Sequence, residues 1–181
     1  MIYILVALES EFKLPSIDFS KYAVCYTGVG KVNAAFAATK CGMQDNCERI
    51  INYGTAGALN KDRIGQLHEI GTVYQRDIDA RPLTPLGTTP YDTVAEAEIK
   101  LGDAGVTLST GDNFVTSLPE IVTDLVDMEA YAIAKVCNKF DIPFTCVKYA
   151  SDFADENAAE HWNDNVAKGK DLFTRWLNDN S

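Results

Sequence analysis

Basic residues are scarce in this chain, and their scarcity excludes two classes of partner. The 181 residues include 16 lysines and arginines against 26 aspartates and glutamates, which gives a net charge of −10. Nucleic-acid backbones and anionic membrane surfaces both require a positively charged face on the protein that binds them. We therefore expect neither nucleic acid nor a membrane as a partner, and small polar ligands stay open.

Histidines are also few, and the cysteines form no closely spaced pair. Only two histidines are present, and the five cysteines are Cys25, Cys41, Cys47, Cys137 and Cys146. This supply of ligands does not suit a structural zinc site, so we expect no metal. An odd number of cysteines in apolar or helical stretches is typical of reduced thiols in a cytosolic protein.

Long apolar runs are missing as well. No segment approaches the roughly 20 apolar residues that a membrane-spanning helix needs. The apolar start at Ile2–Leu8 is short, lacks preceding basic residues and ends at Glu9. It predicts a buried strand rather than a signal peptide.

What the sequence does contain is an alternation of strand-like and helix-like segments. Runs rich in β-branched and aromatic residues predict strands at Ile2–Leu8, Tyr22–Thr27, Arg49–Tyr53, His68–Tyr74, Val106–Thr110 and Phe144–Ala150. Apolar residues at helical spacing predict helices at Lys31–Cys41, Ala130–Phe140 and Asn165–Asn178, with a weak helix at Thr93–Lys100. This order predicts one α/β domain over residues 1–181, with three α/β/α layers around a mixed, mostly parallel, twisted sheet.

Carboxylates stand where predicted strands end and where one helix begins. Glu9 and Glu11 follow the first strand, Asp152 follows the last, and Glu129 precedes the helix at Ala130. Taken singly, each is as well explained by a solvated loop, a helix cap or a favourable charge near a helix N-terminus. However, the carboxyl ends of strands in an open α/β sheet face the ligand-binding crevice. Their shared location favours an acid–base site, because a desolvated carboxyl donates a proton near neutral pH.

Glycine-rich and aromatic segments lie at the same strand ends. Gly28–Lys31 lacks a complete GxGxxG or GK[ST] pattern, so a tight turn is favoured over a phosphate-binding loop. Gly54–Gly57 predicts either an ordinary turn or a place where a ligand approaches the backbone. Phe114 either stacks on a flat ring or belongs to the core. Three prolines within Asp77–Tyr91 predict a long loop there.

Together these segments resemble the nucleoside phosphorylase/nucleosidase superfamily, and most of all its 5′-methylthioadenosine/S-adenosylhomocysteine nucleosidases. The matching stretches, in family order, are residues 7–11, 27–35, 51–57, 109–114, 126–130 and 151–152. The resemblance implies the nucleoside phosphorylase-like fold and a purine nucleoside as the small-molecule substrate. It also implies that no cofactor is used and that the protein is a homodimer.

The resemblance further implies a role for each matching residue. Glu11 is similar to the base that activates the attacking water, and Asp152 to the acid that protonates or hydrogen-bonds purine N7. Glu129 is similar to the acceptor of the ribose hydroxyls. The other implied substrate-binding residues are Met128 beside the sugar, Phe114 stacked on the base, Val115 at the base edge, Thr55, Ala56, Gly57 and Ser151 around ribose and base, and Leu8, Val29 and Trp162 near the 5′ substituent.

The choice between water and phosphate as acceptor depends on arginines. Phosphorylases of this superfamily clamp phosphate with them, and one lies two residues before the glycine that matches Gly54, where this chain has Asn52. No arginine precedes Arg49, and the acids after the first strand would repel phosphate. Hydrolysis is therefore favoured, with a phosphorylase and a non-catalytic nucleoside-binding module as alternatives. The chain is shorter than typical members, notably over Asp77–Gly102, which leaves the 5′ substituent and the dimer interface open.

Overall fold

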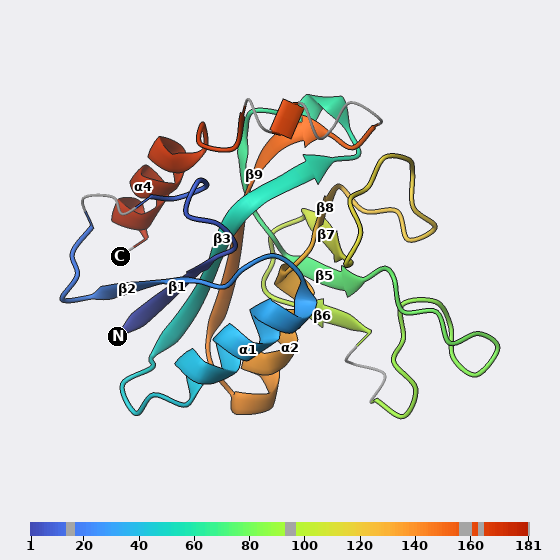
Figure 1. Cartoon of the computed structure of the whole chain (residues 1–181), viewed down its shortest axis with the longest axis horizontal. Coiled ribbons are helices and arrows are strands. Elements are labelled where there is room, and N and C mark those ends of the chain that lie inside the picture. The colour runs from blue at the N-terminus through green and yellow to red at the C-terminus, as the bar shows by residue number, and fades with distance from the viewer. Residues whose placement is uncertain (14–16, 93–96, 156–160, 163–164, 181) are drawn as a thin grey trace.

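The computed structural model describes residues 1–13, 17–92, 97–155, 161–162 and 165–180. Within these residues, nine strands form one mixed sheet with helices on both faces (Figure 1). The strands are β1 (Ile2–Val6), β2 (Tyr22–Tyr26), β3 (Arg49–Ala58), β4 (Leu67–Glu69), β5 (Thr72–Gln75), β6 (Glu98–Lys100), β7 (Thr107–Thr110), β8 (Leu125–Asp127) and β9 (Phe144–Phe153). The helices are α1 (Lys31–Gly42), α2 (Ala130–Phe140), α4 (Lys170–Asp179) and the single 3-10 turn η1 (Lys61–Arg63).

Strand β3 is the strand through which the two halves of the sheet are joined. It pairs in parallel with β1 near its start and with β9 along its length, whereas its last residues pair antiparallel with β8. Beyond β8, the sheet continues through β7 and β5 to the edge strand β6, and β2 and β4 lie at other edges. Because five of the eight strand pairs are parallel, the predicted mixed, mostly parallel sheet is confirmed.

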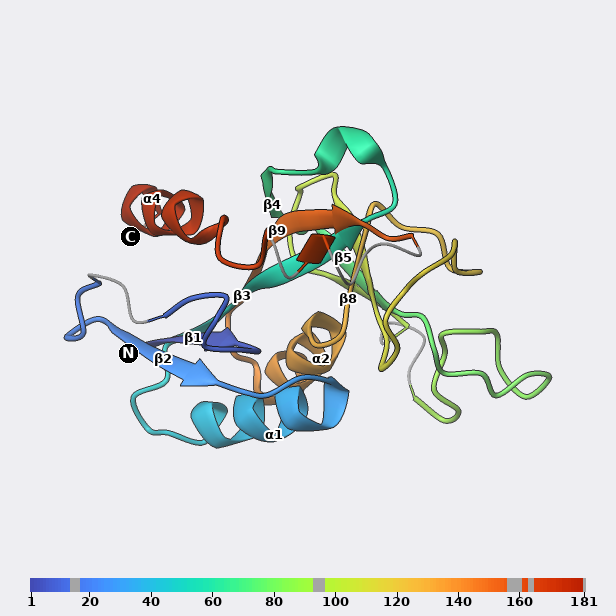
Figure 2. The same cartoon turned by 45° about the horizontal axis from the view of Figure 1, so that its top comes forward.

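The layers follow from alternation of side chains along the central strands. Leu5 and Ile50 pack with α1 and α2 on one face, whereas Ile4 and Ile51 pack with α4 on the other. Successive residues of a strand point to opposite faces, so a strand buried on both sides is apolar throughout. Figure 2 shows α4 across the sheet from α1 and α2. None of the helices formed by the described residues has the length and apolar character needed to span a bilayer.

Two sequence predictions near β3 and β5 were wrong in extent. The predicted strand Arg49–Tyr53 continues to Ala58, because Gly54–Gly57 pair residue by residue with β9, apart from an irregularity before Gly57. Pairing with a buried neighbour here outweighs the low strand propensity of glycine. The predicted strand His68–Tyr74 is two strands, β4 and β5, that pair with different partners. The break falls at Gly71, where a Cβ atom would lie 1.6 Å from the carbonyl oxygen of Ala104.

Three further differences concern elements that pairing or packing decides. The weak helix predicted at Thr93–Lys100 is wrong for residues 98–100, which form β6 as the antiparallel partner of β5, and residues 93–96 lie outside the described part. Strand β8 was missed, since three residues carry too little periodicity. The last helix begins at Lys170 and not at Asn165, because residues 166–169 form a turn. Gly169 in this turn packs against Tyr149, from which a Cβ atom would be 2.5 Å away.

The aromatic cluster beneath α4 supports the loop that carries Glu11. Phe173 of α4 stacks on Tyr53 of β3 with ring centroids 4.0 Å apart. Phe12 meets the same two rings edge-on, at 5.1 Å from Phe173 and 5.4 Å from Tyr53. Since Phe12 is fully buried, the residue before it in the chain is held in place by the core.

We expect Phe173→Ala to lower the free energy of unfolding by about 3–5 kcal/mol, because it leaves a cavity among three aromatic rings. The measurement is urea denaturation. Phe19→Ala is the control, since Phe19 is 57% exposed and its loss should change stability little. Equal, small effects from both substitutions would contradict this account of the core.

Candidate active site

One cavity of about 220 Å³ lies at the carboxyl ends of the central strands. Its walls come from the segments that follow β1, β2, β5, β7 and β8, together with the last residues of β3 and β9. Among the residues predicted to form the site, it is lined by Leu8, Glu11, Val29, Thr55, Ala56, Gly57, Phe114, Val115, Met128, Glu129, Asp152 and Trp162. The remaining one, Ser151, lies behind Asp152 and donates a 2.6 Å hydrogen bond to its carboxylate.

Glu11 is buried and held by three donors. Its Oε1 accepts hydrogen bonds from both the backbone N–H and the hydroxyl of Thr55, each at 2.7 Å, and its Oε2 accepts one from the N–H of Leu8 at 3.0 Å. Glu9, which the sequence left as an alternative, is exposed. A carboxylate oxygen has room for about two donors, so Oε1 is filled and Oε2 keeps one accepting position.

Trp162 completes the environment of Glu11. Its indole N–H donates to the Thr55 hydroxyl oxygen at 2.8 Å. Because an indole N–H can only donate, the Thr55 hydroxyl must direct its own proton elsewhere, toward Glu11. The three side chains therefore form a short chain of hydrogen bonds with a fixed direction.

Asp152, near the end of β9, is 4% exposed. Burial raises the pKa of its carboxyl above the ordinary value, and the hydrogen bond from Ser151 opposes that shift only in part. Gly57 lies against it, since a Cβ atom at Gly57 would be 3.3 Å from Oδ1. His161 is exposed and lines a second hollow next to Asp152.

Glu129 occupies the N-cap position of α2 without capping the helix. Its Oε1 instead accepts a 2.9 Å hydrogen bond from the N–H of Gly30, across the cavity floor from another element. Burial, and next the nearby negative charge of Asp127, raise the pKa of Glu129 from 4.5 to about 7. Its carboxyl is thus close to half-protonated at neutral pH.

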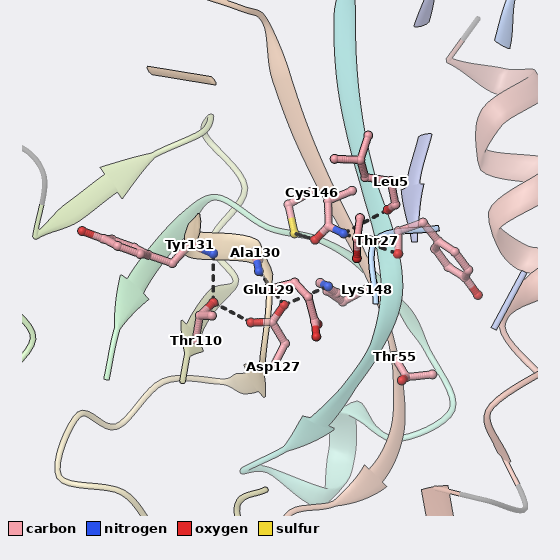
Figure 3. Close-up of polar contacts among 12 residues, drawn as sticks. Leu5, Thr27, Thr55, Thr110, Asp127, Glu129, Ala130, Tyr131, Cys146 and Lys148 are labelled. Atoms are coloured by element: carbon pink, nitrogen blue, oxygen red, sulfur yellow. Dashed lines mark hydrogen bonds and ion pairs between the residues drawn. The ribbon is translucent and has the colours of Figure 1, made fainter. Parts of the chain in front are cut away.

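Asp127 also lines the cavity, and the sequence reasoning missed it. Its carboxylate accepts hydrogen bonds from Thr110 at 2.5 Å and from the N–H of Ala130 at 2.9 Å, and it pairs with Lys148 at 2.9 Å (Figure 3). Burial alone raises the pKa of Asp127, but the charge of Lys148 and these hydrogen bonds lower it overall. The available signal was Lys148 itself, a single charge inside the apolar run of β9.

Arg76, just beyond β5, also lines the cavity and was not predicted. The residue is 6% exposed, and its guanidinium donates to four backbone carbonyls, one in β7, one in β8 and two in the segment after β7. No sequence signal separated it from the charged loop that follows. Within the described residues, no cluster of three or more His, Cys, Asp or Glu side chains could hold a metal ion.

The Gly28–Lys31 segment forms the tight turn that was favoured. Gly28 and Gly30 have φ values of 81° and 94°, in the region that favours glycine. The first N–H groups of α1 bind carboxylates of the protein itself, since Gly30 donates to Glu129 and Lys31 donates to Asp112 at 2.7 Å. Two of the N–H groups at this helix start are therefore already bound to anions of the protein itself.

Comparison with known proteins identifies the class to which this cavity belongs. The model of the phosphorylase superfamily matches residues 9–175, so the chain belongs to that superfamily. The chain is similar to a 5′-methylthioadenosine/S-adenosylhomocysteine nucleosidase of Marinomonas sp., with 32% identity over 74% of this chain and 69% of the relative. It is also similar to an aminodeoxyfutalosine nucleosidase of Helicobacter pylori, with 27% identity over 85% of this chain and 77% of that one.

A solved structure shares the whole fold. A Helicobacter pylori 5′-methylthioadenosine/S-adenosylhomocysteine nucleosidase, crystallised with butyl-thio-DADMe-Immucillin-A, superposes with a TM-score of 0.85 at 22% identity, over 98% of this chain and 97% of the other. The resemblance to the superfamily, and the three-layer fold that it implied, are thereby confirmed.

We expect Glu129→Gln to make the protein more stable at pH 8 than the unsubstituted chain. With a pKa raised from 4.5 to about 7, folded Glu129 keeps a proton that the unfolded chain has released, so stability falls as pH rises through that window. Thermal unfolding at pH 5 and pH 8 measures the effect, at roughly 2–4 °C in Tm per kcal/mol recovered. Glu9→Gln, at an exposed position, should leave the pH dependence unchanged; an unchanged dependence in Glu129→Gln would refute the assignment.

Proposed function

We propose that this protein is a nucleosidase that hydrolyses the N-glycosidic bond of purine nucleosides. The substrates that fit the proposal are adenosines with a 5′-thio substituent, of the 5′-methylthioadenosine and S-adenosylhomocysteine type, with adenine released. Membership of the superfamily and similarity to named nucleosidases support it. The single observation that carries it is that one cavity is lined by two differently held acids, Glu11 and Asp152.

Both acids are held against the same part of β3. Glu11 is bonded to Thr55 and Asp152 lies against Gly57, two residues further along the strand. Since both also line the one cavity, a nucleoside bound there can contact the two acids together.

Each acid has the environment that its proposed role needs. Bond cleavage builds positive charge on the ribosyl ring and negative charge on the leaving base. Asp152, whose raised pKa favours the protonated carboxyl, donates a proton to N7 of the purine. Glu11 accepts the proton of the water through the open position of Oε2. Proton transfers of this kind contribute roughly 10²–10⁴-fold each, and positioning supplies the rest.

The other lining residues hold the substrate in this proposal. Glu129 accepts hydrogen bonds from the ribose hydroxyls beside Met128, Phe114 stacks on the base, and the backbone at Val115 contacts the base edge. Leu8, Val29 and Trp162 face the 5′ substituent. Because Glu129 is close to half-protonated at neutral pH, its hydrogen bonds with ribose strengthen as it ionises.

Water is favoured over phosphate as the acceptor because, in the described part of the chain, the terminal nitrogens of the cations near the cavity already have partners within the protein. All four terminal N–H bonds of Arg76 are given to backbone carbonyls. Asn52, at the position of a phosphate-clamping arginine, is buried and donates to the carbonyl of Leu5 at 3.1 Å. Lys148 is paired with Asp127. A phosphorylase remains the second candidate through the superfamily itself.

We further propose that the enzyme works in the cytoplasm and as a homodimer. All five cysteines are free thiols, which suits a reducing compartment. For the dimer, the supporting feature is an apolar stripe on α1, where Val32 is 80%, Phe36 is 71% and Met43, at its C-cap, is 68% exposed. Apolar side chains at these spacings share one side of a helix, and exposed apolar patches mark contact surfaces.

We expect Asp152→Asn and Glu11→Gln each to reduce adenine release by at least about 100-fold, since each removes one proton transfer. The assay is chromatography of free base after incubating a panel of nucleosides in phosphate-free buffer. Glu9→Gln is the matched control, because it changes an exposed acid two residues from Glu11, and it should retain full activity. Turnover that requires added phosphate would establish a phosphorylase instead, and tight nucleoside binding without turnover would establish a binding module.

We expect Val32→Glu combined with Phe36→Glu to convert the dimer to monomers, because two charges placed on the apolar stripe would have to be desolvated in the contact. Size-exclusion chromatography with light scattering measures the mass. The control is Asn138→Glu, which places a charge at an exposed position of α2, outside the apolar stripe. A dimer that survives the double substitution would exclude α1 as the contact.

A further inference from the structure

We propose that Arg76 is a positioning residue for base recognition, which holds residues 111–115 against the purine. This inference rests on the proposed function and deepens it. The proposed base contacts, Phe114 and Val115, lie in a segment without regular secondary structure between β7 and β8. Phe114 is 46% exposed, so packing alone does not fix its ring.

The guanidinium of Arg76 ties that segment to both flanking strands. One terminal nitrogen donates to the carbonyls of Ser109 in β7 and Asp127 in β8, each at 2.7 Å. The other donates to the carbonyls of Gly111 at 3.2 Å and Asn113 at 2.7 Å. Four carbonyls that would otherwise lack these donors are satisfied by one planar group.

The planar geometry of the guanidinium explains why an arginine occupies this position. Arg76 forms no ion pair with any side chain in the described part of the chain, although it is almost fully buried. Burial lowers its pKa, and more distant carboxylates, Asp127 first, oppose that shift. A buried cation without a paired anion is costly, and a lysine ammonium has three donors and no fixed fork. The planar fork is what the four carbonyls require.

Gly111 packs so closely against this guanidinium that no side chain fits between them. A Cβ atom at Gly111 would lie 3.0 Å from Cζ of Arg76 and 3.1 Å from its Nε and Cγ. Asp77, the residue after Arg76, also binds this segment. Its carboxylate accepts a 2.8 Å hydrogen bond from the N–H of Asp112 and pairs with Lys31 at 2.6 Å. Arg76 and Asp77, adjacent residues after β5, therefore both form hydrogen bonds with residues 111–113.

The test separates base binding from sugar binding. In phosphate-free buffer, kcat and KM for a 5′-thio-adenosine are measured, together with the inhibition constants of adenine and of 5-methylthioribose. We expect Arg76→Lys, Arg76→Met and Gly111→Ala to raise KM and the adenine constant by roughly 10- to 100-fold, the range that misplaced contacts produce. The constant for 5-methylthioribose should stay unchanged, because the sugar does not contact residues 111–115.

Arg81→Met is the matched control, since it removes an exposed arginine that pairs with Asp79 and Glu120, and it should change neither constant. If adenine and 5-methylthioribose both bound more weakly by the same factor, Arg76 would have only a general structural role. An unchanged inhibition constant for adenine would overturn the inference outright. If an Arg76 variant fails to fold, the adenine and 5-methylthioribose constants of Gly111→Ala test the inference in its place. Failure of the unsubstituted protein to cleave any nucleoside would count against the proposed function. The role of Arg76 is tested separately, by the ratio of the adenine constant of each variant to that of the unsubstituted protein.

Discussion

The buried carboxylate of Asp127 is the constraint on which the geometry of this site depends. It binds Thr110 of β7, the first N–H of α2 and Lys148 of β9, while its carbonyl oxygen accepts from Arg76 and from the N–H of Gly111. Four elements far apart in sequence thus meet at one residue. A buried ion pair with additional hydrogen bonds contributes geometric specificity even where its net stabilisation is small.

Burial, and next the charge of Asp127, make the neighbouring Glu129 harder to ionise. Lys148 opposes this effect only in part, so the pKa of Glu129 rises to about 7. Glu129 receives one backbone hydrogen bond, from Gly30, and faces the cavity. The group that we propose accepts hydrogen bonds from the ribose hydroxyls is thus one whose ionisation lowers the stability of the protein, a common compromise between activity and stability.

The charges around the cavity as a whole also bear on the choice between water and phosphate. The cations near it, Arg76 and Lys148, are both bound inside the protein wall, and the start of α1 faces the carboxylates of Glu129 and Asp112. What remains open toward a ligand is mainly acidic or apolar. This distribution suits a neutral sugar, a neutral base and a water nucleophile, and disfavours phosphate on electrostatic grounds.

Local sequence determined the elements with strong apolar patterns and the acids at strand ends. Strands such as β1 and β2 and the helix α2 follow from side-chain periodicity, and the motif resemblance placed Glu11, Glu129 and Asp152 in one site. Only the tertiary structure decided that β3 runs on through Gly57, that β8 and β6 are strands, and that Glu11 and not Glu9 is buried. It also revealed Asp127, Lys148 and Arg76, because their roles consist of contacts between segments about twenty to fifty residues apart, which no local pattern encodes.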